Sequence, residues 1–242
     1  MTATVVIPAR YASTRFPAKI LASETGRPLV QHVVDQVRLC KRVKQITVAA
    51  DDQRIAEALR PFGTKCVLTS PAHPSGTDRI AEVARKLDDD IVVNVQGDEP
   101  EIEPEIVDGL ISRLEKSGSE MATAAAPFPA GADPADPNLV KVVLDSAGRA
   151  LYFSRAKIPF QRDPAAARPP YYLHLGIYAY RRTFLLEYAA WRPTPCETAE
   201  KLEQLRALEH GRAIDVLIVH RGTHGIDTPA QYAEFVARFR KK

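Results

Sequence analysis

The sequence has few cysteines and no long hydrophobic run. Its three cysteines, Cys40, Cys66 and Cys196, are odd in number and widely separated. They offer no metal-type spacing and are typical of small buried side chains in a reducing compartment. No apolar run approaches the about 18 residues that a membrane span needs, and Val5-Val6-Ile7 follow the N-terminus without a charged leader. We therefore expect a cytoplasmic protein with no membrane partner and no secretory signal.

The sequence also lacks a strong excess of one charge and any low-complexity tract. It has 33 Lys and Arg residues against 30 Asp and Glu, a net charge of +3. The basic residues are spread along the chain, which argues against a nucleic-acid partner. A length of 242 residues, 45% of them hydrophobic, suits one large globular domain. Since no internal repeat or long linker divides the chain, we predict a single domain over 1–242.

The first part of the sequence alternates short apolar runs with helical patterns. Strands are expected at 4–7, 45–50 and 66–69, with helices beginning at Pro28 and spanning 52–59. This β-α-β-α-β order implies right-handed crossovers, and therefore an α/β fold with a mostly parallel central sheet flanked by helices.

The segment 91–95 is expected to be the central strand. Four of its five residues are apolar and β-branched, which is typical of a strand buried on both faces. A helix with an apolar face over 106–114 and a strand at 121–126 are expected to follow.

The pattern changes after this strand, and residues 127–180 are expected to be an inserted β-rich lobe. They contain a predicted hairpin of strands 140–144 and 150–154. Aromatic residues at 171–180 suit a strand with a half-buried face or a subunit contact. The α/β pattern then returns, with helices expected at 183–191 and 197–210, a strand at 214–219, and a last helix capped by Thr228 and begun by Pro229.

Charged side chains follow the first and the central strand. Arg10, Arg15 and Lys19 lie in the loop after the first strand, and Asp98 follows the central one. Loops after neighbouring parallel strands share one edge of the sheet. The loop 11–19 contains no glycine, so neither the dinucleotide-binding nor the P-loop pattern is present.

These charges suit transfer of a phosphorylated group. Cations can hold a polyphosphate, while Asp98 and Asp227 can hold a divalent ion that bridges it to an incoming group. The sequence therefore favours phosphoryl or nucleotidyl transfer. Each residue alone also fits a simpler role, since Asp98 can belong to a polar turn, the cations to a solvated loop, and Asp227 to the favourable end of a helix.

Several short segments together resemble the 3-deoxy-manno-octulosonate cytidylyltransferase family, the CMP-Kdo synthetases. The resemblance extends over nearly the whole chain and implies a Rossmann-like nucleotide-diphospho-sugar transferase fold. It also implies a homodimer formed through the inserted lobe. The segments that carry it are 7–15 (IPARYASTR), 75–79 (SGTDR), 94–100 (NVQGDEP), 140–143 (VKVV), 152–155 (YFSR) with 158–159 (IP), 174–178 (HLGIY), 202–206 (LEQLR) and 227–229 (DTP).

The resemblance implies that CMP is transferred from CTP to 3-deoxy-D-manno-octulosonate (Kdo) with release of diphosphate, for lipopolysaccharide biosynthesis. Arg10 and Lys19 would hold the triphosphate and, with Asp98 and Asp227, form the catalytic set; the two aspartates would bind Mg²⁺. The resemblance also places Ala9, Ser75, Gln96 and, more weakly, Arg79 at the nucleotide. At the sugar acid it places Gln96, Arg155, His174, Tyr178, Glu203 and Gln204. Arg155 and His174 would offset the negative charge of the sugar carboxylate.

The chain departs from the family pattern at two places. Ala18 stands where many members have glycine, and Thr198 and Ala199 replace a bulkier pair near the expected sugar pocket. A cytidylyltransferase for 8-amino-Kdo, sialic or pseudaminic acid therefore stays open as an alternative. A Rossmann-type oxidoreductase and a non-catalytic nucleotide-sugar sensor are the more distant hypotheses.

Overall fold

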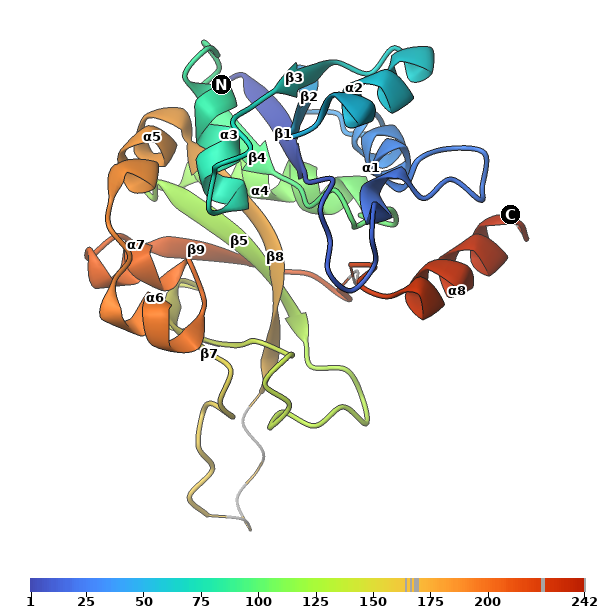
Figure 1. Ribbon diagram of the computed structural model, residues 1–242. Coiled ribbons are helices and arrows are strands. Elements are labelled where there is room, and N and C mark those ends of the chain that lie inside the picture. Colours follow the sequence, from blue (N-terminus) through green and yellow to red (C-terminus); the bar gives the residue numbers. More distant parts are fainter. Residues whose placement is uncertain (164, 166, 168–169, 223–224, 242) are drawn as a thin grey trace.

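The computed structural model describes residues 1–163, 165, 167, 170–222 and 225–241 (Figure 1). Its sheet has the strand order β3-β2-β1-β4-β8-β5-β9, with the hairpin β6–β7 attached to β8. The strands are β1 Ala3–Ala9, β2 Gln45–Ala50, β3 Cys66–Leu68, β4 Ile91–Asn94, β5 Met121–Pro127, β6 Lys141–Leu144, β7 Ala150–Ser154, β8 Tyr172–Arg181 and β9 Ile214–Ile218.

Most of the sheet is parallel, as the sequence predicts. Strands β3, β2, β1 and β4 pair in parallel, and so do β5 and β9. All residues of β1 and β4 are buried, because apolar side chains on both faces of a central strand meet helices on either side.

The helices are α1 Leu29–Val37, α2 Gln53–Leu59, α3 Gly76–Ala84, α4 Pro104–Lys116, α5 Arg182–Ala190, α6 Pro195–Glu200, α7 Leu205–Glu209 and α8 Pro229–Phe239, with 3₁₀ turns at Lys19–Leu21 and Arg60–Phe62.

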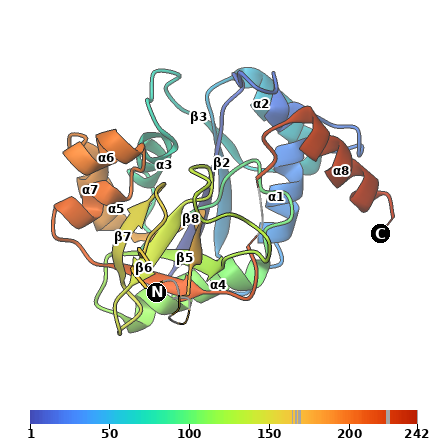
Figure 2. The same cartoon turned by 90° about the horizontal axis from the view of Figure 1, so that it is seen from below.

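The helices cover both faces of the sheet and create two hydrophobic cores. Helices α1, α2 and α4 pack on one face, whereas α3, α5 and α7 pack on the other. In Figure 2, α1 and α2 lie to the right of the strands and α3, α5 and α7 to the left. Helix α8 adds a smaller cluster around Leu29, Tyr232 and Phe235. Thr228 is its N-cap and Pro229 its first residue, which confirms the predicted start of the last helix.

The strand expected at 171–180 lies inside the main sheet. It is β8, which runs antiparallel to both β4 and β5. Tyr178 and Tyr180 stack with each other, and Tyr180 stacks on Tyr188 of α5, so the aromatic residues form an internal sheet face. The expected lobe 127–180 is therefore joined to the main sheet, since its last strand is β8 and its hairpin pairs with β8 through β6. Residues 164, 166 and 168–169 of this stretch lie outside the described residues. The predicted hairpin β6–β7 is confirmed within it.

The single helix expected at 197–210 is wrong, because two short helices occupy this region. Lys201 has φ 54° and ψ 48° and ends α6 in the left-handed conformation. The chain then turns through Leu202, which is buried, before α7 begins at Leu205. The apolar spacing of this segment suits a continuous helix, and no glycine or proline marks the break. The connection 201–204 consequently passes across the end of the sheet, where it contributes to the site.

Within the described ranges, no helix combines the length and the hydropathy that a membrane span needs.

Candidate active site

A cavity of about 490 Å³ lies at the carboxyl ends of β1 and β4. The strand order changes direction between these two strands, and ligands of doubly wound sheets gather at such a point. The loop after β1, the start of α3, the turn after β4 and the start of α8 all reach it. The charged side chains expected at one edge of the sheet therefore do converge, since Arg10, Arg15, Lys19, Asp98 and Asp227 all line this cavity. Glu203, expected at the sugar acid, lines it as well.

Lys19 joins the two aspartates at the centre of the cavity. Its Nζ lies 2.6 Å from Oδ2 of Asp98 and 3.3 Å from Oδ1 of Asp227. Arg15 places Nη2 at 3.0 Å from the same Asp227 oxygen. The lysine side chain is only 10% exposed, so its charge is screened weakly by water and depends on these carboxylates. Two carboxylates from distant parts of the chain therefore point at one cation position.

The backbone around Asp98 fixes that arrangement. A Cβ on Gly97 would lie 2.9 Å from the carbonyl oxygen of Pro8, so only glycine lets the turn after β4 pass so close to the end of β1. The amide of Ile226 donates to the carbonyl oxygen of Asp98 over 2.9 Å. This bond holds the segment that carries Asp227 beside the central strand.

The loop after β1 is folded against the sheet on the other side of the cavity. Nη2 of Arg10 donates to the carbonyl oxygen of His73 over 3.2 Å, and the amide of Tyr11 donates to Oδ1 of Asp51 over 2.8 Å. Ala18, just before Lys19, has φ 52° and ψ 27°. This left-handed conformation costs about 1–2 kcal/mol for a residue with a Cβ, which gives a physical reason for the glycine that the resemblance implies here.

The N-terminus of α3 also faces this cavity. Ser75 caps the helix, because its Oγ accepts from the amide of Asp78 and donates to Oδ2 of Asp78 over 2.7 Å. Ser75 and Gly76 both line the cavity, and the free amides at a helix start favour a bound anion. Ala9 and Arg79, expected near the nucleotide, are not among the lining residues. Arg79 is fully buried and donates to Oγ1 of Thr69 over 2.7 Å.

A second cavity of about 280 Å³ adjoins the first. The two share Gly76, Gln96 and Glu203 in their linings. Nε2 of Gln96 donates to the carbonyl oxygen of Gly176 over 3.3 Å, so this side chain forms part of the shared wall. The second cavity brings together the expected residues Gln96, Tyr178, Glu203 and Gln204, and adds Thr77, Asn94, Gly176, Tyr180, Tyr188, Lys201 and Leu202.

Two buried polar atoms of this second cavity have no hydrogen-bond partner among the described residues. They are Nε2 of Gln204 and Oδ1 of Asn94, and both side chains are 2% exposed. A buried donor or acceptor without a partner costs about 1–3 kcal/mol, and such groups usually have one. Both side chains therefore keep unused hydrogen-bonding capacity beside this cavity.

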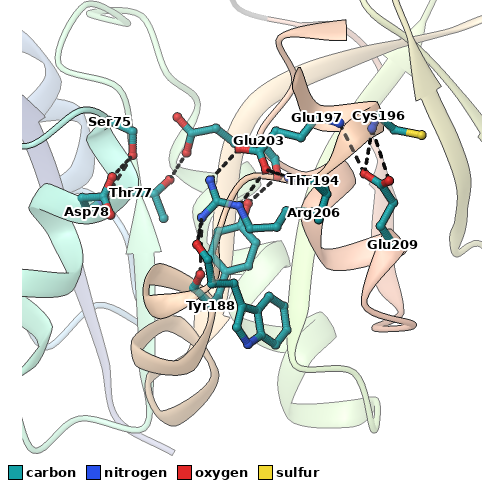
Figure 3. Close-up of polar contacts among 11 residues, drawn as sticks. Ser75, Thr77, Asp78, Tyr188, Thr194, Cys196, Glu197, Glu203, Arg206 and Glu209 are labelled. Atoms are coloured by element: carbon teal, nitrogen blue, oxygen red, sulfur yellow. Dashed lines mark hydrogen bonds and ion pairs between the residues drawn. The ribbon is translucent and has the colours of Figure 1, made fainter. Parts of the chain in front are cut away.

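Glu203 is held in place by hydrogen bonds to two helices (Figure 3). Oγ1 of Thr77 donates to Oε2 of Glu203 over 2.6 Å, and Oη of Tyr188 donates to its carbonyl oxygen over 2.5 Å. Burial raises the pKa of Tyr188, so its hydroxyl stays protonated as the donor. Behind Tyr188, the guanidinium of Arg206 makes a buried ion pair with Glu197, with contacts of 2.5 and 2.8 Å, that joins α6 to α7.

His174 and Arg155 lie outside both linings. Nε2 of His174 contacts Oγ1 of Thr123 at 3.1 Å, and its ring packs on Phe153. Burial lowers the pKa of His174 to about 3, so the ring is neutral near pH 7. The guanidinium of Arg155 donates to the backbone carbonyls of Pro137, Glu200 and Lys201.

Sequence reasoning missed Asn94, Thr77 and Lys201 as lining residues. Asn94 interrupts an otherwise β-branched strand, and Thr77 lies in the first turn of a helix at the sheet edge; both signals are in the sequence. Lys201 carries no such signal, because its position depends on the unmarked break between α6 and α7.

A cavity with cations, a helix N-terminus and a carboxylate pair at the switch point of a doubly wound sheet suits an α/β nucleotidyltransferase. A model of the cytidylyltransferase family matches residues 4–214. The chain belongs to this family.

Curated relatives and a solved structure resemble the chain over its whole length. The 3-deoxy-manno-octulosonate cytidylyltransferases of Geobacter metallireducens and Leptospira biflexa are both 47% identical to it; each alignment covers 98% of this chain, with 98% and 96% of the respective relatives. A solved structure of CMP:2-keto-3-deoxy-manno-octonic acid synthetase complexed with CTP superposes with a TM-score of 0.94, at 40% identity, over 100% of this chain and 99% of that one.

Proposed function

We propose that this enzyme transfers CMP from CTP to Kdo and releases diphosphate, as the names of its relatives indicate for those proteins. The observation that carries the proposal is the pair of adjoining cavities. One has cations, a helix N-terminus and two carboxylates, and the other has unpartnered buried amide atoms suited to a polyhydroxylated ligand.

The first cavity suits CTP. Arg10, Arg15 and Lys19 supply positive charge to its lining, and the N-terminus of α3 adds free amides. A triphosphate between them would exchange water for cations and oriented amides. Lys19 would then turn from the aspartates toward the phosphates, and its ammonium would offset their charge.

Asp98 and Asp227 fit a divalent cation, and we propose that they hold Mg²⁺. The ammonium of Lys19 already shows that both carboxylates reach one cation position. No group of three or more His, Cys, Asp or Glu residues in the described ranges could hold a metal alone, so phosphate oxygens and water would complete the shell. When bound, the ion would neutralise phosphate charge and lower the pKa of the attacking hydroxyl.

The second cavity would hold Kdo beside the α-phosphate. Its wall of Gln96 and Glu203 is common to both cavities, so a sugar hydroxyl lying there meets the nucleotide directly. Nε2 of Gln204 would donate to one hydroxyl and Oδ1 of Asn94 would accept from another. Holding both reactants in contact accounts for a large part of the barrier reduction in such a reaction.

We also propose a cytoplasmic homodimer, with lipopolysaccharide precursors as its product class. The described residues that follow β7 project away from the sheet (Figure 1) and include Phe160, which is 83% exposed, while Leu151 of β7 is 59% exposed. Exposed apolar side chains on a projecting segment favour a subunit contact. Sedimentation should give a dimer for the wild type and a monomer for a Leu151→Asp, Phe160→Asp variant; a wild-type monomer would contradict this.

The reaction is tested by measuring diphosphate release from CTP and Mg²⁺ with and without Kdo. We expect release that requires Kdo, stops with EDTA and yields CMP-Kdo by mass spectrometry. Release only with a different keto sugar acid would change the substrate, and CTP binding without release with any acid would contradict the proposed activity.

A further inference from the structure

The connection between α6 and α7 forms one side of the second cavity. Lys201, Leu202, Glu203 and Gln204 all line it. Lys201 begins this connection in the left-handed conformation, with φ 54° and ψ 48°. A lysine rarely adopts this conformation, and glycine is the usual residue.

The balance of charge in the second cavity is unusual for a site that takes an acid. Among the described residues that line it, the charged ones are Lys201 and Glu203. Glu203 accepts a hydrogen bond from Thr77 and would repel an incoming carboxylate. Lys201 is exposed and has no ion-pair or hydrogen-bond partner for its ammonium among the described residues.

His174 and Arg155, the two residues expected to meet the sugar carboxylate, do not supply a cation to this cavity. His174 is neutral near pH 7, because burial lowers its pKa to about 3. Arg155 lies outside the lining, and its guanidinium donates to the backbone carbonyls of Pro137, Glu200 and Lys201. Among the described residues that line the second cavity, the cation that an entering carboxylate meets is therefore Lys201.

We propose that Lys201 binds the carboxylate of the sugar acid, and that Arg155 is a positioning residue that holds the Lys201 turn. The proposal rests on the proposed function and adds the residue that selects an acidic sugar. An ammonium beside a carboxylate in a partly enclosed cavity gives a strong charge-assisted hydrogen bond. This would compensate for the nearby charge of Glu203.

The contacts of Arg155 support its part in this arrangement. Its Nε donates to the carbonyl oxygen of Glu200 over 2.7 Å, and its Nη2 lies 3.4 Å from that of Lys201. The carboxylate of Glu200 accepts from the Arg155 amide over 2.9 Å and from Oγ of Ser154 over 2.6 Å. Ser154 at the end of β7 and Arg155 directly after it thus hold the two residues at which α6 ends, and so fix the backbone of Lys201.

The test compares Kdo with its neutral carboxamide in the wild type and in Lys201→Ala. In the wild type, KM for the carboxamide should exceed that for Kdo by about 10- to 100-fold, the range for a hydrogen bond to a charged group. In Lys201→Ala the two KM values should become similar. The KM for CTP should not change, and Lys201→Arg should restore much of the preference for the acid.

Lys86→Ala, which removes an exposed lysine outside both cavities, is the matched control and should behave as the wild type. An unchanged preference for the acid in Lys201→Ala would overturn the role of Lys201, provided that the wild type uses Kdo. Absence of Kdo-dependent release by the wild type would overturn the proposed function and this inference together.

Arg155→Ala tests the positioning role. It should raise KM for Kdo in the wild-type background and add little in the Lys201→Ala background, since both changes remove one interaction. The melting temperature of each variant shows whether the fold is retained. Effects of the two substitutions that multiply would mean that Arg155 acts on the substrate independently, and would overturn its role as a support for Lys201.

Discussion

The two cavities share a wall but are built by different physical means. The nucleotide cavity is formed by turns that directly follow parallel strands, and its charges are paired in a cluster of Lys19, Asp98 and Asp227. The sugar cavity is walled by buried tyrosines and by the irregular connection between α6 and α7. Strand topology therefore determines the first cavity, whereas side-chain packing and an unusual backbone turn determine the second.

The largest effect is expected for Asp98→Asn. This change removes a charge from the cation position without changing the shape of the side chain, and activity should fall at least about 1,000-fold. The fold should persist, because Asp227 still pairs with Lys19. Diphosphate release and circular dichroism check both points, with the exposed Asp88→Asn as control; turnover close to that of the wild type would remove Asp98 from the mechanism.

Gly97→Ala should damage the nucleotide cavity through the backbone. The added methyl would lie 2.9 Å from the Pro8 carbonyl oxygen, which forces β1 and β4 apart and costs about 1–3 kcal/mol of unfolding free energy. CTP binding should weaken as well. Gly118→Ala is the matched control, because a Cβ there meets nothing within 4 Å; equal stability of the two variants in urea would contradict the close approach.

The free energy of unfolding should depend on pH through His174, which packs beside Tyr178. Burial lowers its pKa from 6.5 to about 3, so between these values the unfolded chain binds the proton and the folded chain does not. Stability is therefore complete above pH 6.5 and decreases as pH falls toward 3, by up to about 1.4 kcal/mol per pH unit. His174→Gln should lose this component in urea unfolding across pH, whereas His210→Gln, which replaces an exposed histidine, should keep it.

The smallest effect is expected for Ala18→Gly. Glycine removes the energetic cost of the left-handed conformation in the folded protein. It also gives the unfolded chain more conformational freedom, which offsets part of the gain, so the free energy of unfolding should rise by about 0.5 kcal/mol. Ala22→Gly should instead destabilise, because Ala22 has φ −55° and ψ 124° and needs no glycine. Thermal unfolding compares the pair, and a loss of stability in Ala18→Gly would contradict the strain assigned to this loop.

The contrast between the cavities also explains what the sequence could predict. Strand β4 is apolar and β-branched, and Gly97 and Asp98 follow it directly, so periodicity places them at the sheet edge without further information. The order of β1 to β4 then brings Arg10 and Lys19 to the same edge. The segments that resemble a family extend the prediction of site residues to Glu203 and Gln204, which do line the second cavity.

The remainder could not be predicted because it depends on contacts between distant residues. The break at Lys201 has no local marker, since only tertiary packing of Leu202 and the clamp from Arg155 favour it. The placement of Tyr172–Arg181 between β4 and β5 depends likewise on pairing between strands far apart in the chain. Its aromatic pattern fits a sheet face and a subunit contact equally well.

The assignment of one substrate to each cavity is tested most directly by CTP titration calorimetry, together with KM for Kdo, in Arg10→Gln and Gln204→Met. Arg10 lines only the first cavity and Gln204 only the second. Arg10→Gln should weaken CTP binding, whereas Gln204→Met should leave it unchanged and raise KM for Kdo. Weakened CTP binding in Gln204→Met, with KM for Kdo unchanged, would contradict the assignment.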